Sequence, residues 1–315
     1  MDSLNRSAIE LVDEALDFAG ELDIRPYELD SGATVVDFGV EADGGIEAGL
    51  FLAEIQTAGL ASVHTSMETL SGAPRPYVEL TTDHPALSLL GSQKAGWELD
   101  FDGFDGLGSG PARALVAEEA EFTELDYVDA FDFAVLAIES VDLPTDQIAA
   151  HVAEMAGVEP HAVYLPTYAA GSMAGSVSMA ARAAELAVFR LFELGYPLGA
   201  IETAAGTAPI APVTYDESVA LGRTNDAIVY GGEVYLQVTE PSPVFEELPS
   251  SAGDEYGRPF EAIFESVEWD FYDVPESVFA PGQVTIDVIG GETITVGETD
   301  EELLCESFGI VQQTG

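Results

Sequence analysis

The fold class is decided by the stretch "AFDFAVLAIESVDLPTDQIAAHVAEMAGVEPHAVYLPTY", residues 130–168. It opens with a continuous apolar run of strand length, residues 130–140. Residues 144–157 begin with Pro and end with Gly, as helices often do, and residues 161–168 are typical of another strand. Such alternation of strands and helices indicates a mixed α/β protein.

The same alternation continues on both sides of this stretch. Apolar patterning predicts further helices at residues 3–19, 46–57, 85–95, 173–194, 262–268 and 301–308, and strands at 34–40, 61–69, 77–82 and 97–101. Two later stretches place Gly-Gly between β-rich runs and predict tight hairpins: "DAIVYGGEVYLQV" (226–238) and "QVTIDVIGGETITVG" (283–297). We therefore predict a mixed α/β fold with an N-terminal α/β portion at 1–125 and a second α/β portion with C-terminal hairpins at 126–315, whose segments can interleave.

The composition is strongly acidic, with 58 Asp and Glu residues against 9 Lys and Arg residues and a net charge of −49. Because the hydrophobic fraction is 47% and the charged fraction only 21%, the acids are a solvated coat on an ordinary core. Such a charge repels itself at low salt. In concentrated salt the Debye length falls to about 3 Å, so the composition indicates a protein of a halophile.

Several partners and locations are excluded by the same composition. Nucleic acid and anionic membranes bind Lys and Arg, which are few in this chain and outnumbered by acids. No apolar run approaches the ~20 residues of a membrane span, and residues 1–18 form an acidic amphipathic pattern without the cationic region of a signal peptide. The single cysteine, Cys305, excludes an internal disulfide. We expect a cytoplasmic protein that binds neither nucleic acid nor membranes.

Familiar catalytic motifs are missing. The Gly-rich "GLGSGPAR" (106–113) lacks the spacing of nucleotide-binding loops, and its Ser109 does not have the glycine spacing of a nucleophile elbow. The four histidines form no zinc motif, and Phe104 stands where a calcium loop at 100–106 would need an oxygen ligand. We therefore expect no metal and no nucleotide bound through loops of these types.

The surviving basic residues are the strongest remaining signal. Lys94, Arg113, Arg182 and Arg223 stand beside Gly, Ser, Thr or Ala rather than in acidic runs. Small residues let the backbone approach a ligand, and Ser/Gly loops expose N–H groups to anions. Any one of these residues can instead form an internal ion pair. Four of them together favour a cleft that accommodates an anion.

Arg182 and Glu185 in "AARAAE" (180–185) are three residues apart, so on a helix they share one face. A surface ion pair of small value is one interpretation. Residues 178–184 are nearly all Ser, Ala or Met, which favours a packed or pocket-lining helix. A carboxylate beside a guanidinium in such a place stays ionised and oriented, as a general base should.

Six segments in order resemble the methenyltetrahydromethanopterin cyclohydrolase family. They run through essentially the whole chain: "TTDHPALSLLGSQKAGW" (81–97), "GSGPARAL" (108–115), "GSVSMAARAAE" (175–185), "GTAPIAPV" (206–213), "GRTNDAIVYGGEVYL" (222–236), and a terminal group with "PFEAIFE", "DFY" and "VFAPGQV" (259–284). The resemblance implies a two-domain α/β fold with the substrate pocket between the domains, and a homotrimer. With the composition, it implies an extremely halophilic archaeon as the source.

The resemblance also implies a reaction. The cationic N5,N10-methenyl bridge of a reduced pterin carrier, methenyl-tetrahydromethanopterin, is hydrolysed to the N5-formyl form without a cofactor. Glu185 would be the base that activates water, and Arg182 would hold it ionised. Substrate contacts would come from Lys94, Ser109, Gly110, Arg113, Arg223 and Asn225. The same reaction on methenyl-tetrahydrofolate, a non-catalytic pterin-binding protein and a structural assembly protein stay open as alternatives.

Overall fold

The computed structural model describes residues 3–101, 103–267 and 274–310. The chain divides into two compact units, one made of Met1–Ser62 and Ala86–Ser178 and the other of Val63–Pro85 and Met179–Gly315. These units interleave along the sequence, so their segments are not those of the predicted portions 1–125 and 126–315. No described helix combines the length and the apolar character needed to cross a bilayer.

The first unit is built on a sheet with the strand order β1-β2-β9-β8-β6-β5, in which β7 also pairs with β9. Its strands are β1 (Arg25–Glu28), β2 (Thr34–Gly39), β5 (Ala95–Glu98), β6 (Leu107–Ser109), β7 (Ala134–Val135), β8 (Ala137–Glu139) and β9 (Val163–Tyr168). The strands β2, β7 and β8 run parallel to β9. The helix α5 (Asp146–Ala156) connects β8 to β9, as a parallel crossover requires. The strand–helix–strand order predicted for residues 130–168 is confirmed.

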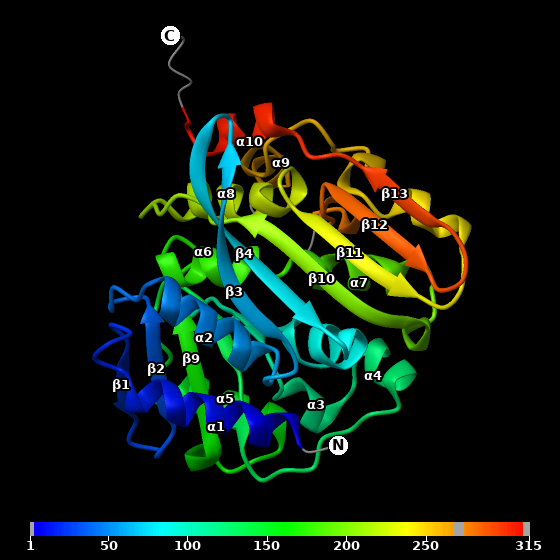
Figure 1. Ribbon diagram of the computed structural model, residues 1–315. Coiled ribbons are helices and arrows are strands. Elements are labelled where there is room, and N and C mark those ends of the chain that lie inside the picture. The colour runs from blue at the N-terminus through cyan, green and yellow to red at the C-terminus, as the bar shows by residue number, and fades with distance from the viewer. Residues whose placement is uncertain (1–2, 102, 268–273, 311–315) are drawn as a thin grey trace. The chain divides into compact units, whose positions relative to one another are not determined.

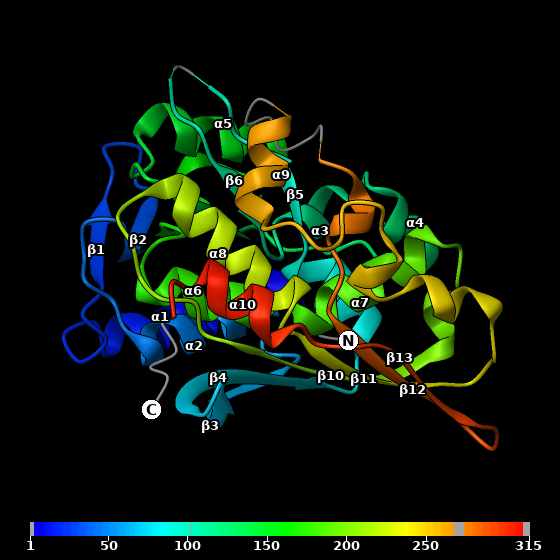
Figure 2. The same cartoon turned by 90° about the horizontal axis from the view of Figure 1, so that it is seen from above.

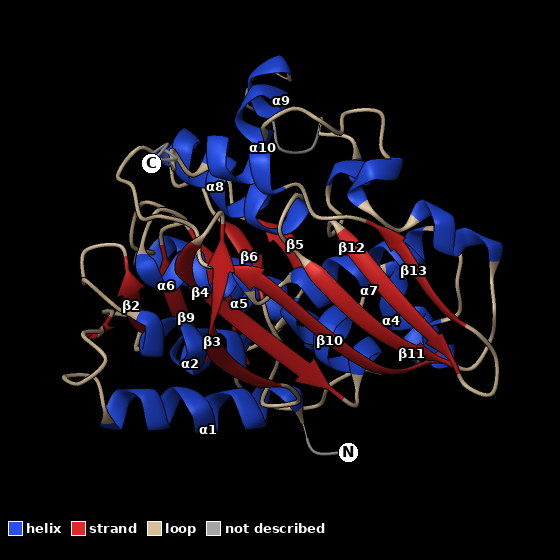
Figure 3. Cartoon of the chain, turned by 45° about the horizontal axis from the view of Figure 1, so that its top comes forward, coloured by secondary structure: helices blue, strands red, loops and turns tan. Residues whose placement is uncertain are grey.

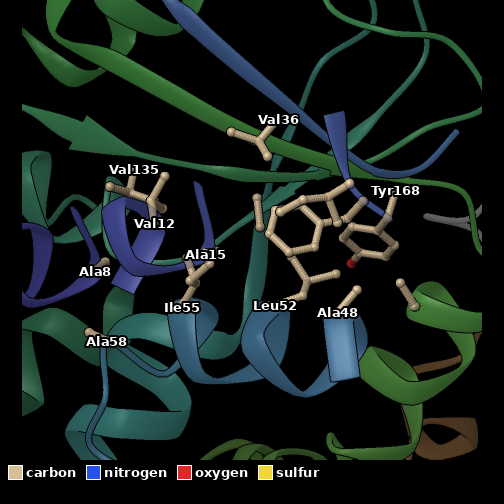
Figure 4. Close-up of a cluster of buried hydrophobic side chains, with 14 of the residues drawn as sticks. Ala8, Val12, Ala15, Val36, Ala48, Leu52, Ile55, Ala58, Val135 and Tyr168 are labelled. Carbon is tan, nitrogen blue, oxygen red and sulfur yellow. The ribbon is translucent and has the colours of Figure 1, made fainter. Parts of the chain in front are cut away.

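The helices of this unit cover both faces of the sheet. Its other helices are α1 (Leu4–Asp17), α2 (Ile46–Gln56), α3 (Arg113–Val116), α4 (Ala120–Leu125), the π-helix η1 (Ala86–Gln93) and the 3-10 helix η2 (Pro160–Ala162). Val135 and Ala137 face the cluster formed with α1 and α2, whose members include Val12, Leu52 and Ile55 (Figure 4). The alternate residues Ala134 of β7, Ile138 of β8 and Leu136 between the two strands face the cluster around α5. Burial on both faces explains why residues 130–140 are a continuous apolar run.

The second unit has a sheet with the order β13-β12-β11-β10-β4-β3. Its strands are β3 (Ser62–Leu70), β4 (Ala73–Thr82), β10 (Ile201–Pro209), β11 (Glu233–Val238), β12 (Gln283–Val288) and β13 (Thr293–Gly297), and its helices are α7 (Ala183–Glu193), α8 (Glu217–Val229), α9 (Phe260–Ser266) and α10 (Glu301–Ser307). Short 3-10 helices span Leu198–Ala200, Pro243–Glu247, Ser250–Ala252 and Glu276–Val278. In Figure 1, β10 lies between β4 and β11 along the middle of this sheet.

One face of this second sheet is covered by helices. In Figure 2, α7, α8 and α10 all lie on the same side of its strands. The burial pattern agrees, because Val234, Leu236 and Val238 of β11 are buried while Glu233 and Tyr235 are exposed. A sheet with one covered face shows this alternation; this sheet is mixed, since β11 pairs in parallel with β12 while its pairing with β10 is antiparallel.

The predicted mixed α/β class and most predicted elements are confirmed, and three details differ. The first hairpin, 226–238, is wrong: its first four residues end α8, and only Glu233–Val238 form a strand. The expected helix at 173–194 is two helices, α6 (Met173–Ala180) and α7, with a break at Ala181 and Arg182. The expected helix at 85–95 is the π-helix η1. Residue 268, at the end of the helix predicted at 262–268, lies outside the described residues.

Candidate active site

Arg182 and Glu185 meet at the start of α7. Arg182 is the N-cap residue of this helix, and Glu185 lies in its first turn, where the helix dipole favours a negative charge. A guanidinium nitrogen of Arg182, Nη1, donates to Oε2 of Glu185 at 3.0 Å. The side chains are only 6% and 3% exposed. The pairing predicted from the sequence is therefore present, although it forms across a helix start rather than along a continuous helix.

Burial decides what this pair can do. Surface ion pairs are worth little, but a buried pair is costly to break because one charge is then left without its partner. The guanidinium fixes the orientation of the carboxylate and favours its ionised form. A carboxylate oriented in this way meets the geometric requirement for a general base, which is a positioned proton acceptor.

Lys94 and Arg113 lie together in the first unit with two carboxylates. The Nε atom of Arg113 donates to Glu119 at 2.9 Å, and Nη2 donates to Glu121 at 3.1 Å. The Nζ atom of Lys94 lies 2.8 Å from Oε1 of Glu121 and 3.6 Å from Oε2 of Glu119. Burial raises the pKa of Glu119, but its hydrogen bonds with Arg113 and the charges of Arg113 and Lys94 outweigh burial and hold that pKa below its usual range. Two cations and two carboxylates here form one neutral cluster, which we call the Lys94–Arg113 cluster.

Each of the three guanidinium nitrogens of Arg113 donates a hydrogen bond to a neighbouring carboxylate or backbone carbonyl. Its side chain is 0% exposed, and Nη1 donates to the carbonyl oxygens of Lys94 at 2.8 Å and Leu90 at 3.1 Å. For Arg113 the geometry matches the internal ion pair that the sequence left open. Its contact with an anionic substrate stays a prediction that this geometry does not favour. Lys94 is less enclosed, with 16% of its side chain exposed.

Ser109 is held by the buried side-chain amide of Gln56, a residue that the sequence patterns did not single out, and Gly110 is held by a backbone hydrogen bond. The Nε2 atom of Gln56 donates to Oγ of Ser109 at 3.1 Å, and the Ser178 hydroxyl donates to Oε1 of Gln56 at 2.8 Å. The backbone N–H of Gly110, where φ is +108°, donates to the carbonyl of Ser92 at 2.9 Å. A glutamine at the end of the apolar helix 46–56 is the signal that could have revealed this network, because a buried amide needs partners.

Arg223 and Asn225 lie on α8 in the second unit. The Nδ2 atom of Asn225 donates to the carbonyl of Leu221 at 2.9 Å. Arg223 donates from Nε to the carbonyl of Ser307 at 3.2 Å, and within the described residues no carboxylate lies within 4.0 Å of its guanidinium. Among the described residues, no carboxylate therefore competes with an anion for this guanidinium, which donates to backbone carbonyl oxygens.

Two further features bear on the chemistry. Over the described ranges no group of three or more His, Cys, Asp or Glu side chains is placed to hold a metal ion. A recess in the second unit is lined in part by Tyr230, Tyr256 and Ile263, and the predicted site residues do not line it.

Fold and site together define a mixed α/β protein that carries a buried carboxylate aligned by a guanidinium, a class of site suited to activating water. A family model described as Cyclohydrolase (MCH) matches residues 3–308, and the chain belongs to this family. The resemblance noted in the sequence is confirmed.

The sequence similarity to known relatives extends over almost the whole of both chains. A methenyltetrahydromethanopterin cyclohydrolase of Halobacterium salinarum is 56% identical over 310 residues, which are 98% of this chain and 100% of the relative. Enzymes of the same name from Methanothermobacter marburgensis and Methanococcoides burtonii are 39% and 37% identical, each over 98% of this chain and over 100% and 99% of the relative. The acidic composition fits the similarity to the Halobacterium protein.

Proposed function

We propose that this chain is a hydrolase that opens the N5,N10-methenyl bridge of methenyl-tetrahydromethanopterin, a cyclic amidine, to give the N5-formyl form. The observation that carries the proposal is the buried Arg182–Glu185 pair at 3.0 Å. Relatives up to 56% identical bear the name of this activity, and the family match covers residues 3–308.

Glu185 acts as the base in this mechanism. Its carboxylate orients a water molecule and takes a proton from it as the oxygen adds to the electrophilic methenyl carbon. The bond from this carbon to N10 then breaks, Glu185 returns its proton to N10, and the proton of the new hydroxyl leaves to solvent as the formyl C=O forms. One water is consumed and one proton is released. General-base catalysis of this kind contributes about 10²–10⁴-fold, and positioning of the water contributes more.

Arg182 acts through Glu185. Its hydrogen bond to Oε2 fixes the carboxylate plane and favours the ionised form. The substrate needs no redox step, so the proposed reaction uses no cofactor. The anionic tail of the carrier would meet Lys94 and Arg223, with Ser109, Gly110 and Asn225 as polar contacts. We further propose a homotrimer in the cytoplasm, as the resemblance implies.

The test is a spectrophotometric assay of the purified protein in molar KCl, with methenyl-tetrahydromethanopterin and methenyl-tetrahydrofolate as separate substrates. Loss of the methenyl absorbance with the methanopterin substrate is expected. Turnover of the folate substrate alone would show that the enzyme performs the same reaction on a folate carrier. Binding of either substrate without any change in absorbance would identify a non-catalytic pterin-binding protein.

Lys94→Arg tests the predicted substrate contact of the lysine. A planar guanidinium is larger than the compact ammonium that lies 2.8 Å from Glu121. We expect KM to rise or kcat to fall, with kcat/KM lower by about tenfold, a change of about 1.4 kcal/mol. Steady-state kinetics and a thermal melt in high salt check this result.

Lys94→Met is the matched control, because it removes the charge and leaves Glu121 paired with Arg113 alone. It should lower the melting temperature more than Lys94→Arg does. If Lys94→Arg has wild-type kinetics and an unchanged melting temperature, Lys94 is a structural member of the Lys94–Arg113 cluster and does not contact the substrate.

A further inference from the structure

The first turn of α7, which carries Glu185, packs against an unusually small stretch of β10. Ala204, Gly206 and Ala208 are alternate residues on the helix-covered face of this strand, and Ala183 and Ala184 of α7 are buried. On the neighbouring strands, Gly206 lies opposite Leu80 of β4 and Val234 of β11, both buried and much larger. Figure 3 shows α7 behind the strands of this sheet. The helix start is thus seated over the smallest residues in the centre of the sheet.

Gly206 allows the closest part of this approach. A Cβ atom at this position would lie 2.7 Å from the backbone nitrogen of Ala184 and 3.0 Å from its Cβ. The first atom belongs to the backbone and cannot turn aside as the end of a flexible side chain could. An added methyl group would therefore displace the helix turn itself or the strand.

The backbone conformation gives no other reason for glycine here. Gly206 is not among the residues with positive φ, and it lies inside a regular strand paired on both sides. Glycine inside a strand is less stable than alanine by roughly 0.5–1 kcal/mol. A strand glycine of this kind marks a place where another part of the backbone comes close. At Gly206 that part is Ala184, the residue directly before Glu185.

We propose that Gly206 is a positioning residue for Glu185. It sets the distance between β10 and the first turn of α7, and so fixes where the Glu185 carboxylate stands relative to Arg182. The inference rests on the proposed function, because its readout is the hydrolysis in which Glu185 is the base. A misplacement of a catalytic group by about 1 Å can cost about 10²-fold in rate.

Gly206→Ala is the test, assayed beside the wild-type chain in molar KCl. We expect kcat to fall at least tenfold with KM changed by less than threefold. The acid limb of the kcat–pH profile should move to higher pH, because a longer Arg182–Glu185 hydrogen bond favours the ionised carboxylate less. Ala184→Ser adds one atom from the helix side and is the milder second variant, expected to move both quantities in the same direction. If Gly206→Ala does not fold, the kcat and pH profile of Ala184→Ser test the positioning role in its place.

Gly231→Ala is the matched control. Its added Cβ would lie 2.8 Å from the backbone oxygen of Ala227 and from Cδ2 of Leu304, and 3.0 Å from Cδ of Pro209, similarly tight contacts in the same unit that do not involve α7. We expect it to lower the melting temperature and to leave kcat and the pH profile unchanged. A Gly206→Ala protein that is destabilised like Gly231→Ala but keeps wild-type kcat and pH profile would overturn the positioning role. Absence of hydrolysis by the wild-type chain would instead overturn the proposed function.

Discussion

Replacing Glu185 with glutamine is expected to lower kcat by two or more powers of ten while the chain stays folded. Glutamine keeps the shape of the side chain and can still accept the hydrogen bond that Arg182 donates at 3.0 Å. It cannot take a proton from water, so the general-base contribution of about 10²–10⁴ is lost. Because the loss falls on a step that follows substrate binding, KM should change little. Steady-state kinetics with the methenyl substrate in molar KCl measure it.

Stability must be followed in the same experiment. The substitution leaves the buried Arg182 guanidinium opposite a neutral amide, and loss of one partner of a buried pair can cost about 3–5 kcal/mol. A circular dichroism melt in high salt separates unfolding from loss of the base. Glu193→Gln, at the exposed end of the same helix, is the control and should keep wild-type kcat. Turnover by Glu185→Gln close to that of the wild type would remove Glu185 from the mechanism.

Local patterns predicted those elements whose burial is simple. The strand–helix–strand at 130–168 could be seen because residues 134–138 are buried on both faces, which leaves an unbroken apolar run. The hairpin at 283–297 has exposed glycines at 290–291 between two strands, as its sequence indicated. The Arg182–Glu185 pair could also be predicted from a local pattern, since three-residue spacing places both side chains on one side of a helical turn.

Long-range pairing could not be seen in this way. The strand β4 pairs with β10, more than a hundred residues later, and this pairing places residues 63–85 in the second unit. A residue's own neighbours carry no signal of such a partner, so a single cut at residue 125 was the natural reading. The misplaced strand at 226–230 has a related cause. Ile228, Val229 and Tyr230 have high strand propensity, but their buried positions at the end of α8 override that preference.

The break between α6 and α7 was also hidden, because alanine on both sides of Arg182 is compatible with a continuous helix. Directly after the break, the start of α7 lies against Gly206 of β10, a contact between residues distant in the sequence. The break places Arg182 at the helix N-cap and Glu185 in the first turn, where a carboxylate is favoured. The composition of small residues was visible in the sequence, but the contact that they allow was not.

Asp226 is a buried acid that none of the predicted motifs identified. It lies on α8, and its Oδ1 atom accepts the backbone N–H of Phe260 at the start of α9 at 2.9 Å. Its Oδ2 atom is buried and has no hydrogen-bond partner among the described residues. Burial raises the pKa of Asp226 to about 7, and the charge of Glu261 adds to this, while the nearby Ser307 hydroxyl, which lies outside full hydrogen-bond geometry, and the Phe260 N–H offset part of it. The folded protein therefore favours the neutral form of this carboxyl group.

The sign of the resulting pH dependence follows from linkage. The pKa of Asp226 in the folded state, about 7, is above its ordinary value of 3.8. Its contribution to stability is therefore fully present below about pH 4 and is lost as the pH rises to about 7. Above that pH the folded protein carries a buried charge. With about 1.4 kcal/mol for each unit of pKa difference, the loss is at most about 4 kcal/mol.

Asp226→Asn should remove this loss. The amide keeps an oxygen to accept the Phe260 N–H and carries no charge at any pH, so we expect it to raise the free energy of unfolding at pH 8 by roughly 1–4 kcal/mol. At about 2–4 °C per kcal/mol, the melting temperature at pH 8 should rise by several degrees. The difference between variant and wild type should grow from pH 4 to pH 7 and then level off. Thermal melts of both proteins from pH 4 to pH 8 measure this difference. A constant molar KCl concentration keeps the screening of the other acidic residues fixed.

Asp216→Asn on the same helix provides a control of opposite sign. Asp216 is exposed at the N-cap of α8, where its Oδ1 accepts the Val219 N–H, and a hydrogen bond from Ser218 lowers its pKa. Its stabilising effect is therefore present above about pH 4, so the variant should melt below the wild type at pH 8. A difference between Asp226→Asn and wild type that stays constant from pH 4 to pH 8 would show that Asp226 titrates as an ordinary carboxyl. The buried Oδ2 atom would then need a partner such as a bound water, because only a hydrogen bond to the charged form could offset its burial.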